Sequence, residues 1–512
     1  MLANRKIFFH CLLFILYSQV LFSQDILRKE VTIKSRIHIA DQLLDSLHKD
    51  LNVVFVYSDI IKPSRKITIS PGEYSLKQVL DSILTIRDFQ YITRKNLVIL
   101  SPQSPDNNGE ERYVVKGKVM NKREKPIPFA TIYFRNSSKG TIANGEGEFR
   151  FIIPASMSDD TLFVSSVGYE NVKIAPEIYL SQSLQIHLKN AVIPIKDIIV
   201  RPEIPDEIVM KSWDDRFKNY NTKPLLLTAF FRETSKQNDD YISLTEALIE
   251  INKSSYTSNA EDLIKLVKGR NGTNINQSEL VNLVVQGGLY NGLRLDIAKY
   301  GSYFFGKDAL QECNYRMVKT TFFQGRQTYI IGFEMKPGLN YAGYKGNLYF
   351  DAENLALVRA EFELSPEGIK FAKSALVKKT PKGFSARPVS ARYEVEYRYY
   401  NNVWNLHYAH SEVDIKVKRL RAKGKRSFSC NFVSTSEFVI TGIDKNPSDR
   451  IRYREAAHSN DVLVKQVQNT NESFWSDDNI IIPEEPLLST IEKLQKKGLI
   501  PSAQSADTKQ KN

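Results

Sequence analysis

The chain has 512 residues, of which 42% are hydrophobic and 25% are charged, so it is too long for one ordinary core and too apolar to be disordered. We expect two to four domains of about 100–200 residues each. The formal net charge of +13 favours contact with anionic lipid headgroups or acidic glycans. Nucleic acid is not expected as a partner, because the N-terminus indicates export.

The N-terminus has the pattern of a secretory signal peptide. Arg5 and Lys6 precede an apolar run over residues 7–22, and Ser23 offers a small residue before a cleavage site at Gln24. The run is shorter than the ~18–20 residues of a membrane-spanning helix, although an uncleaved anchor remains an alternative. We predict a signal peptide over residues 1–23 and a location in the periplasm or at the outer membrane.

Cysteine usage excludes a disulfide scaffold. Cys11 leaves with the signal peptide, so the mature chain keeps Cys313 and Cys430. One bridge between them and two free buried thiols both remain open, because sequence separation does not give the Cα distance that a bridge requires.

Residues 24–101 predict a small α/β domain in which a helix and a strand-like run occur twice. Apolar residues recur at helical spacing at Leu43, Leu44 and Leu47, and again at Leu76, Val79, Leu80 and Ile83. Strand-like runs follow at residues 53–57 and 97–100, and another precedes the second helix at residues 67–69.

The segment Ser75-Leu76-Lys77-Gln78-Val79-Leu80-Asp81, followed by Phe89-Gln90-Tyr91 and Leu97-Val98-Ile99, resembles the short N-terminal (STN) domain of secretins and TonB-dependent outer-membrane transducers. The resemblance spans residues 30–101 and implies a periplasmic protein-interaction module without catalytic residues. Lys77, Gln78 and Asp81 are then docking candidates, because the apolar face of their helix belongs to its own core. A small α/β domain without that kinship is the alternative.

After a polar linker over residues 102–112, the hydrophobic period changes from helical to two residues, which indicates a β-sandwich. Within it, "KGTIANGEGEFRF" (139–151) predicts a hairpin turn at Asn144 and Gly145, because both tolerate positive φ. Gly147 and Gly168 are further turn residues. A calcium loop would contain Asp ligands, and this stretch has none. A phosphate loop would continue into a helix, whereas a strand follows here.

This segment also resembles the carboxypeptidase regulatory-like domain of bacterial envelope proteins. The matching residues are Gly117, Val119, Pro126, Ile127, Pro128, Ala130, Gly140, Thr141, Gly147, Phe149 and Ser165-Ser166-Val167-Gly168-Tyr169. The resemblance implies a seven-stranded, transthyretin-like sandwich over residues 113–190 and no activity. The His-x-x-Glu motif of zinc carboxypeptidases is absent from the chain.

A Pro-rich linker over residues 191–205 leads to a large region of mixed α and β pattern over residues 206–475, with a polar tail and a short helix over residues 476–512. Helices are predicted near residues 205–220, 261–268 and 279–285. From Met317 a two-residue period predicts consecutive antiparallel strands, as a meander or open barrel with one charged face. The overall fold class is therefore multidomain and mainly β. Phe231-Arg232-Glu233, Glu246, Gly346 and Asp351 loosely resemble an uncharacterised region of Bacteroidetes-type envelope proteins, from which no activity is assigned.

Two features of this region are candidates for a functional site. His407 and His410 lie three apart on a predicted strand, so they point to opposite faces and cannot share a metal ion. The segment 416–426 is strongly basic and predicts a solvated hairpin tip, with contact to an anionic surface as the alternative. Its basic residues are Lys416, Lys418, Arg419, Arg421, Lys423, Lys425 and Arg426.

The sequence therefore predicts a non-enzymatic envelope protein that acts through protein-interaction modules, without a cofactor, metal or catalytic residue. It associates with the outer membrane or its assembly and transport machinery, and its partners are periplasmic or outer-membrane proteins. Gly-x-Ser-x-Gly, His-Glu-x-x-His and Walker motifs are absent. Two alternatives remain: a glycan-active enzyme with a carboxylate site in residues 206–475, and a truncated relative of TonB-dependent transducers.

Overall fold

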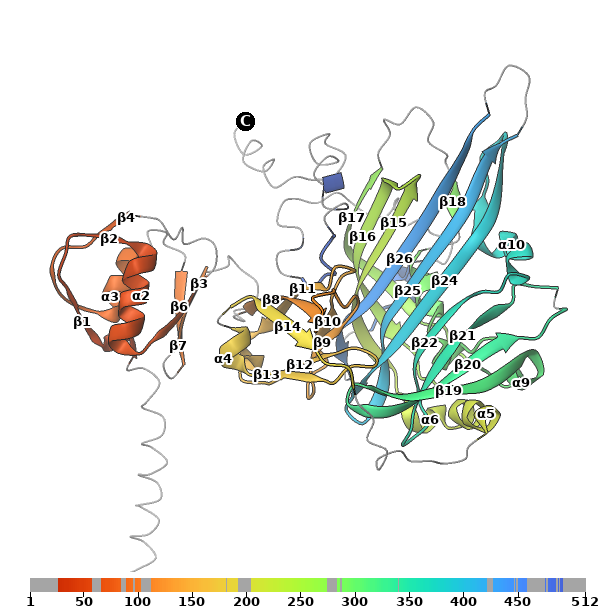
Figure 1. The fold of residues 1–512 in the computed structure, drawn as a ribbon, viewed down its shortest axis with the longest axis horizontal. Helices are drawn as coiled ribbons and strands as arrows, with labels where there is room; N and C mark the ends of the chain where they lie inside the picture. The colour runs from red at the N-terminus through yellow and green to blue at the C-terminus, as the bar shows by residue number, and fades with distance from the viewer. Residues whose placement is uncertain are drawn as a thin grey trace, which may run out of the picture. The chain divides into compact units, whose positions relative to one another are not determined.

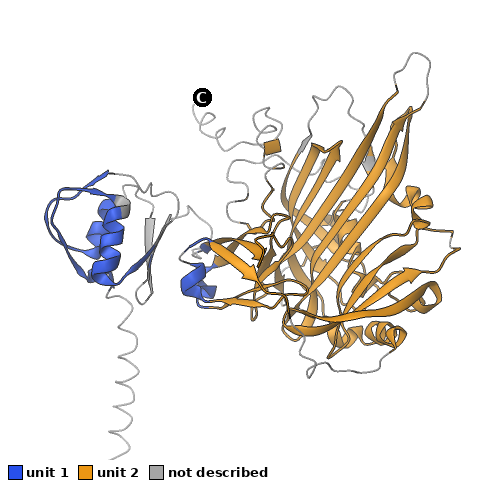
Figure 2. Ribbon diagram, viewed as in Figure 1, with its two compact units in different colours: residues 1–113, 154–159, 175–183 blue, residues 114–153, 160–174, 184–512 orange. Residues whose placement is uncertain are grey.

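A computed structural model describes residues 26–57, 66–83, 89–94, 97–102, 112–180, 182–191, 204–273, 283–285, 288–338, 340–420, 427–445, 447, 450–457, 475, 478–484, 487 and 489–490. The predicted signal peptide, both predicted linkers in large part and most of the predicted tail lie outside these residues. Within them, no helix has the length and apolar character needed to cross a membrane. The chain is mainly β and divides into two compact units (Figure 2).

Unit 1 contains residues 1–113 together with residues 154–159 and 175–183. Its N-terminal elements are η1 (Ile26–Arg28), β1 (Glu30–Ile33), β2 (Ile37–Ile39), α2 (Ala40–Leu51), β3 (Val54–Tyr57), β4 (Lys66–Thr68), β5 (Gly72–Ser75), α3 (Leu76–Ile83), β6 (Phe89–Arg94) and β7 (Leu97–Pro102). The strands form three small sheets, β1-β5, β2-β4 and β3-β7-β6, and β3 runs parallel to β7. The apolar residues predicted at helical spacing on α2 and α3 form the core of this unit.

The regulatory-like module contributes two sheets (Figure 1). Its strands are β8 (Arg112–Asn121), β9 (Thr131–Phe134), β10 (Gly140–Ile142), β11 (Glu148–Pro154), β12 (Leu162–Ser165), β13 (Val172–Ile174) and β14 (Leu184–Leu188), with the short helices η2 (Ala155–Met157) and α4 (Pro176–Tyr179). The strand orders are β10-β9-β12-β13 and β11-β8-β14, and β8 runs parallel to β14.

The predicted turn at Asn144 and Gly145 is present, with the Gly147 N–H donating to the Asn144 carbonyl (3.0 Å), but it differs from the predicted hairpin turn in two respects. The strands on either side, β10 and β11, belong to different sheets, so the turn connects the two layers. The positive φ, +75°, falls on Gly147. Asn144 holds the turn with its side chain, because its Oδ1 accepts hydrogen bonds from the backbone N–H groups of Glu146 (3.0 Å) and Glu148 (2.8 Å).

The large region forms a ten-stranded antiparallel sheet in the order β17-β16-β15-β26-β25-β24-β22-β21-β20-β19 (Figure 1). Its strands are β15 (Leu225–Gln237), β16 (Asp240–Lys253), β17 (Leu263–Thr273), β19 (Cys313–Phe323), β20 (Arg326–Met335), β21 (Tyr344–Asp351), β22 (Leu357–Leu364), β24 (Phe384–Tyr400), β25 (Val403–Arg419) and β26 (Ser429–Asp444). A separate two-stranded sheet pairs β18 (Val284–Val285) with β23 (Val377–Lys379). The remaining helices are α5 (Pro205–Asp214), α6 (Arg216–Asn219), α7 (Leu289–Arg294), α8 (Ile297–Tyr300), α9 (Ala309–Glu312), η4 (Gly368–Lys370), α10 (Lys373–Leu376) and η5 (Tyr453–Glu455).

Two predicted helices of this region are wrong. Residues 263–273 form the strand β17, and the described end of the predicted helix 279–285 is the strand β18. Ile264 of β17 and its cross-strand partner Ile251 of β16 are both buried, so pairing with β16 outweighs the helical spacing of the local sequence.

One face of the large sheet, here called the inner face, packs on helices α5, α7 and α8 through the main apolar core. A buried ionic network fastens α8 to the sheet. Lys253 Nζ lies 2.8 Å from Asp262 Oδ2 and 2.6 Å from Asp296 Oδ2, and Lys299 Nζ lies 2.5 Å from Asp262 Oδ1. The Tyr397 hydroxyl donates to Asp296 Oδ1 (2.8 Å). Two cations and two carboxylates thus neutralise one another away from water.

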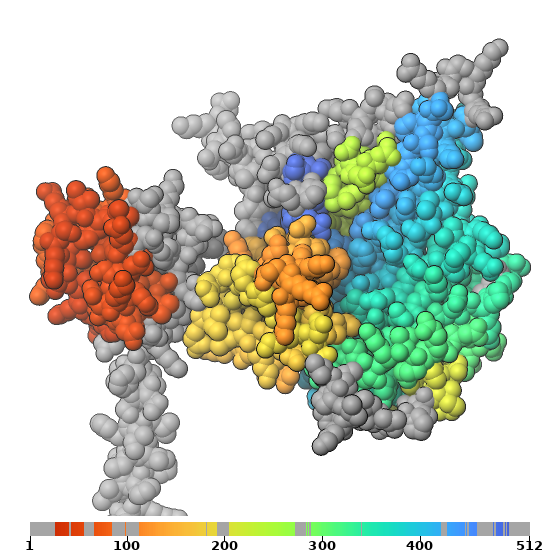
Figure 3. Space-filling view, viewed as in Figure 1, coloured from red at the N-terminus to blue at the C-terminus, as the bar shows by residue number. Residues whose placement is uncertain are grey.

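The other face, the outer face, carries the sandwich module, which lies against the large sheet in the space-filling view (Figure 3). Thr131 Oγ1 donates to Glu396 Oε1 (2.6 Å), and the Arg398 guanidinium donates to the carbonyls of Ser138 (2.5 Å) and Lys139 (2.8 Å). Burial lowers the pKa of Arg398 to about 10. These polar contacts fix the module beside the uncovered part of the outer face.

Residues 478–484, here called the C-terminal strap, join the module to the outer face. The Asn479 side chain pairs with the backbone of Ile152 in both directions, at 2.6 and 2.9 Å. The Arg232 guanidinium donates to the Ile481 carbonyl. A segment predicted as a polar tail therefore belongs to the packed structure, and Ile480 and Ile481 are buried.

Candidate functional site

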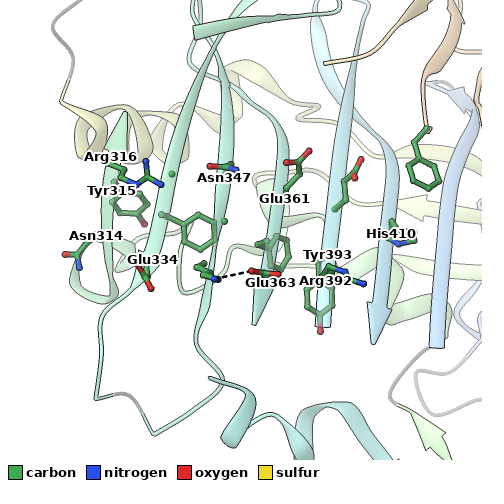
Figure 4. Close-up of a pocket in the computed structure, with 17 residues that line it drawn as sticks. Asn314, Tyr315, Arg316, Glu334, Asn347, Glu361, Glu363, Arg392, Tyr393 and His410 are labelled. Carbon is green, nitrogen blue, oxygen red and sulfur yellow. Dashed lines mark ion pairs between the residues drawn. The ribbon is translucent and has the colours of Figure 1, made fainter. Parts of the chain in front are cut away.

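A groove with a cavity volume of about 700 Å³ crosses the outer face over strands β19, β20, β21, β22, β24 and β25 (Figure 4). Phe129, in the loop before β9, lines it from the sandwich module. The size is that of a ligand site for a small molecule or a short polymer segment.

Strand register builds the floor of the groove from two rows of polar side chains. The first row crosses the strands through Arg316, Gly332, Asn347, Glu361, Glu394 and His410, which are successive cross-strand partners. The second row is formed in the same way by Asn314, Glu334, Lys345, Glu363 and Arg392. Figure 4 shows the labelled members of each row on neighbouring strands.

A third row of residues lies between the two polar rows. Its side chains point away from the groove, because side chains alternate between the two faces of a sheet, so its backbone faces the groove. Phe333 and Phe362 of this row point to the inner face, where their rings lie 4.3 and 4.7 Å from that of Phe304. Gly346 sits between them, and a Cβ there would come within 2.1 Å of the Glu361 carbonyl. The floor is therefore flat and polar along its centre.

A cluster around Arg359 holds the acidic end of the groove. Its Nη2 lies 2.8 Å from Glu361 Oε1 and 2.7 Å from Glu394 Oε1, and its Nη1 lies 2.6 Å from Glu396 Oε2. Burial raises the pKa of Glu394 and of Glu396, and the charge of Arg359 opposes that rise. One guanidinium thus faces three carboxylates, so this end of the groove favours a proton or a cation.

His410 completes this end as a neutral imidazole, because burial lowers its pKa. Its Nδ1 has no hydrogen-bond partner among the described residues, and its ring lies 5.7 Å from that of Phe129. His407 does not line the groove, and burial lowers its pKa to about 3. In the described parts of the chain, no three His, Cys, Asp or Glu side chains are grouped to hold a metal ion.

The predicted docking residues lie in unit 1, on the exposed face of α3. Lys77 and Asp81 form an ion pair of 2.9 Å, and Gln78 Oε1 accepts a hydrogen bond from the backbone N–H of Ser75 (2.8 Å). Docking through them stays a prediction.

The basic segment is described only in part. Lys416, Lys418 and Arg419 end β25, and Lys416 Nζ donates to Asn431 Oδ1 (2.8 Å). Arg421, Lys423, Lys425 and Arg426 lie outside the described residues. The choice between a solvated tip and a contact with an anionic surface therefore stays open.

Cys313 and Cys430 are free and buried, as one of the two alternatives had it. Burial raises the pKa of Cys313 to about 11 and also raises that of Cys430, so both thiols stay protonated at neutral pH.

Sequence reasoning missed the groove. The available signal was the charged face of the predicted strands, as in "YKGNLYF" and "ARYEVEYRYY". Assembling residues as far apart as Asn314 and His410 into rows requires the register of six strands, which the pattern does not supply.

Comparison with known proteins identifies one part of the chain. Residues 115–200 match the family model of the CarboxypepD_reg-like domain. This CarboxypepD_reg-like domain is non-catalytic, and it supplies the sandwich that lines the groove through Phe129. No curated protein matches the chain.

Some solved structures align with the chain at low similarity. A LolA superfamily protein from Nitrosomonas europaea (9% identity, TM-score 0.19) aligns over 48% of this chain and 96% of its own. A DUF1329 family protein from Desulfovibrio piger (9%, 0.22) covers 48% and 96%. A putative membrane-associated protein of unknown function from Bacteroides fragilis (12%, 0.13) covers 66% and 100%. TM-scores this low support no conclusion about fold or function.

Proposed function

We propose that the protein is a non-enzymatic component of the cell envelope and that its groove binds a short, mixed-charge segment of a partner polypeptide. The observation that carries the proposal is the charge pattern of the floor. The first row places Arg316 at one end and Glu361 and Glu394 at the other, and the second row alternates acidic with basic residues. Such a floor is complementary to a segment that carries both charges.

Glu361, Glu363 and Glu394 of the groove each pair with a basic side chain, which favours binding over hydrolysis. Arg359 contacts Glu361, Glu394 and Glu396 at 2.6–2.8 Å, and Lys345 pairs with Glu363 (3.3 Å). The unpartnered Nδ1 of His410 and the exposed guanidinium of Arg316 remain to contact a ligand. Fixed partners reduce the entropy lost when the groove is filled.

The envelope part of the proposal rests on the signal-like residues 1–23 and on the CarboxypepD_reg-like domain. In this proposal, unit 1 is an STN-like docking module of a Bacteroidetes-type protein, and the partners are periplasmic or outer-membrane proteins. Arrival in the periplasm or at the outer membrane is tested by fractionation and by mass spectrometry of the mature N-terminus.

The groove is tested by capturing partners on the purified protein and mapping the contacts by crosslinking. Arg316→Glu reverses the charge at one end of the first row, and Lys319→Glu is the matched control on the same strand, since Lys319 is exposed and does not line the groove. We expect Arg316→Glu alone to remove the crosslinks to strands β19–β22. Equal capture by both variants would contradict the proposal.

A glycan-active enzyme is the second candidate, because Glu361 and Glu394 both contact Arg359 Nη2 and the pKa of Glu394 is raised. Two close carboxyl groups with one raised pKa are the arrangement that glycoside hydrolysis requires. Release of reducing ends from peptidoglycan by the wild type, lost in Glu394→Gln, would establish this activity in place of simple binding.

A further inference from the structure

A second pocket, separate from the groove, lies at the helical side of the large region. It has a volume of about 440 Å³ and is lined by residues of α5, of α8, of α9 and of the loop between α8 and α9. Its lining residues are Trp213, Tyr300, Gly301, Ser302, Tyr303, Gly306, Lys307, Asp308, Ala309 and Glu312.

The walls of the pocket are aromatic rings that are only partly buried. Tyr303 is 55% exposed and Tyr300 is 38% exposed, while Trp213 is half-buried. Their orientations are fixed from behind, because Trp213 packs edge-on against Phe305 (5.6 Å) and Tyr303 lies against Tyr341 (4.7 Å). Rigid exposed rings with a polar rim are the usual walls of a binding site for an amphipathic ring.

Polar groups stand at the bottom and rim of the pocket. The Ser302 hydroxyl is buried and has no hydrogen-bond partner among the described residues. Asp308 is exposed at the rim and can accept hydrogen bonds, while Glu312 is held by the Tyr341 hydroxyl (2.5 Å). A ligand with hydroxyl groups can donate hydrogen bonds to the exposed Asp308 carboxylate.

The charges around the pocket bear on whether its ligand is neutral or ionic. Lys307, Asp308 and Glu312 line the pocket, and Arg216 lies against its Trp213 wall, so two positive and two negative charges balance and favour a neutral ligand. The Arg216 guanidinium already lies 4.0 Å from the Trp213 ring centroid, so this ring has its cation in place.

We infer that this pocket binds a neutral pyranose ring of a glycan, with Trp213 and Tyr303 against its apolar face and the Asp308 carboxylate accepting hydrogen bonds from its hydroxyl groups. The site is independent of the groove and of the proposed polypeptide partner. It lies outside residues 115–200, which match the CarboxypepD_reg-like domain.

The test is saturation-transfer NMR on the purified full-length protein with methyl glycosides of glucose, galactose, mannose and N-acetylglucosamine. Methyl glucuronoside and choline are the anionic and cationic comparisons. We expect saturation of at least one neutral glycoside and none of the two ions. Trp213 fluorescence reports the same event, because Trp404 and Trp475 are buried.

Tyr303→Ala and Asp308→Ala remove a wall and an acceptor at exposed positions, so both variants should fold. Each is expected to lower the affinity for the glycoside at least tenfold. Tyr453→Ala is the matched control at an exposed tyrosine (74%) outside the pocket. Undiminished binding in both pocket variants, saturation by choline in place of sugars, or no saturation by any glycoside would overturn the inference and leave the groove proposal untouched.

Discussion

Thr131 Oγ1 donates a 2.6 Å hydrogen bond to Glu396 Oε1, and this contact ties the CarboxypepD_reg-like domain to the carboxylate cluster of the groove. Both side chains are almost wholly buried. The domain is therefore part of the wall and of the electrostatics of the candidate site.

Thr131→Val should destabilise the protein by about 1.5–3 kcal/mol, because a buried carboxyl group loses its donor while the side-chain shape is kept. Urea unfolding measures the change. Thr32→Val, at an exposed strand position of unit 1, is the control and should shift stability by less than about 0.5 kcal/mol. Equal effects of the two changes would show that the contact contributes nothing.

Gly168→Val should destabilise by about 1–3 kcal/mol. The cause is backbone conformation, since φ at Gly168 is +80° and the nearest atom to a built Cβ is 3.8 Å away. Gly168→Asn should cost less, because asparagine tolerates positive φ better than a β-branched residue. Thermal melting of both variants measures these changes in stability. A valine variant as stable as the wild type would contradict the prediction.

Lys253→Met should destabilise by about 3–5 kcal/mol, because it leaves Asp262 and Asp296 buried with too little positive charge. Lys265→Met is the matched control, since Lys265 pairs with Glu250 on the exposed part of neighbouring strands. That change should stay within about 1 kcal/mol. Denaturant midpoints of the two variants give the comparison.

Acid should remove the contribution of Asp262. Lys253 and Lys299 lower its folded-state pKa from 3.8 to about 2. A depressed carboxyl pKa stabilises the folded state above the unfolded pKa, and this stabilisation is lost as the pH falls from about 4 to about 2. The stability gap between wild type and Asp262→Asn should therefore narrow by about 2 kcal/mol over that interval. A constant gap would contradict the assigned pKa.

Deleting residues 30–101 should abolish capture of the partners of unit 1 without unfolding residues 113–475. The core of unit 1 contains residues from Ile26 to Val98, and the core of the large sheet begins at Ile208. The double variant Lys77→Glu/Asp81→Lys keeps the ion pair but exchanges the positions of its two charges. Loss of capture in this variant would show that partners recognise this surface of α3, and not only that the module must be present. Retention of every partner after the deletion would contradict docking through unit 1.

The local pattern of apolar residues was sufficient to predict an element that buries one apolar face. The spacing of Leu76, Val79 and Leu80 predicted α3, and the two-residue period after Met317 predicted the antiparallel strands. It failed at residues 263–273, where pairing with β16 decides the structure. The groove could not be predicted for the same reason, since Arg316 and Glu394 are placed in one row only by the register of the three strands between them.

The C-terminal strap has a consequence for the order of assembly. β11 ends its sheet, and the Asn479 amide covers that edge by bonding to Ile152. The strap comes after the sandwich and the large sheet in the chain, so a nascent or truncated molecule presents an open strand edge and an uncovered Arg232 to its surroundings. Such an intermediate is prone to pair with a second copy through the open edge, and completion of the strap removes that edge.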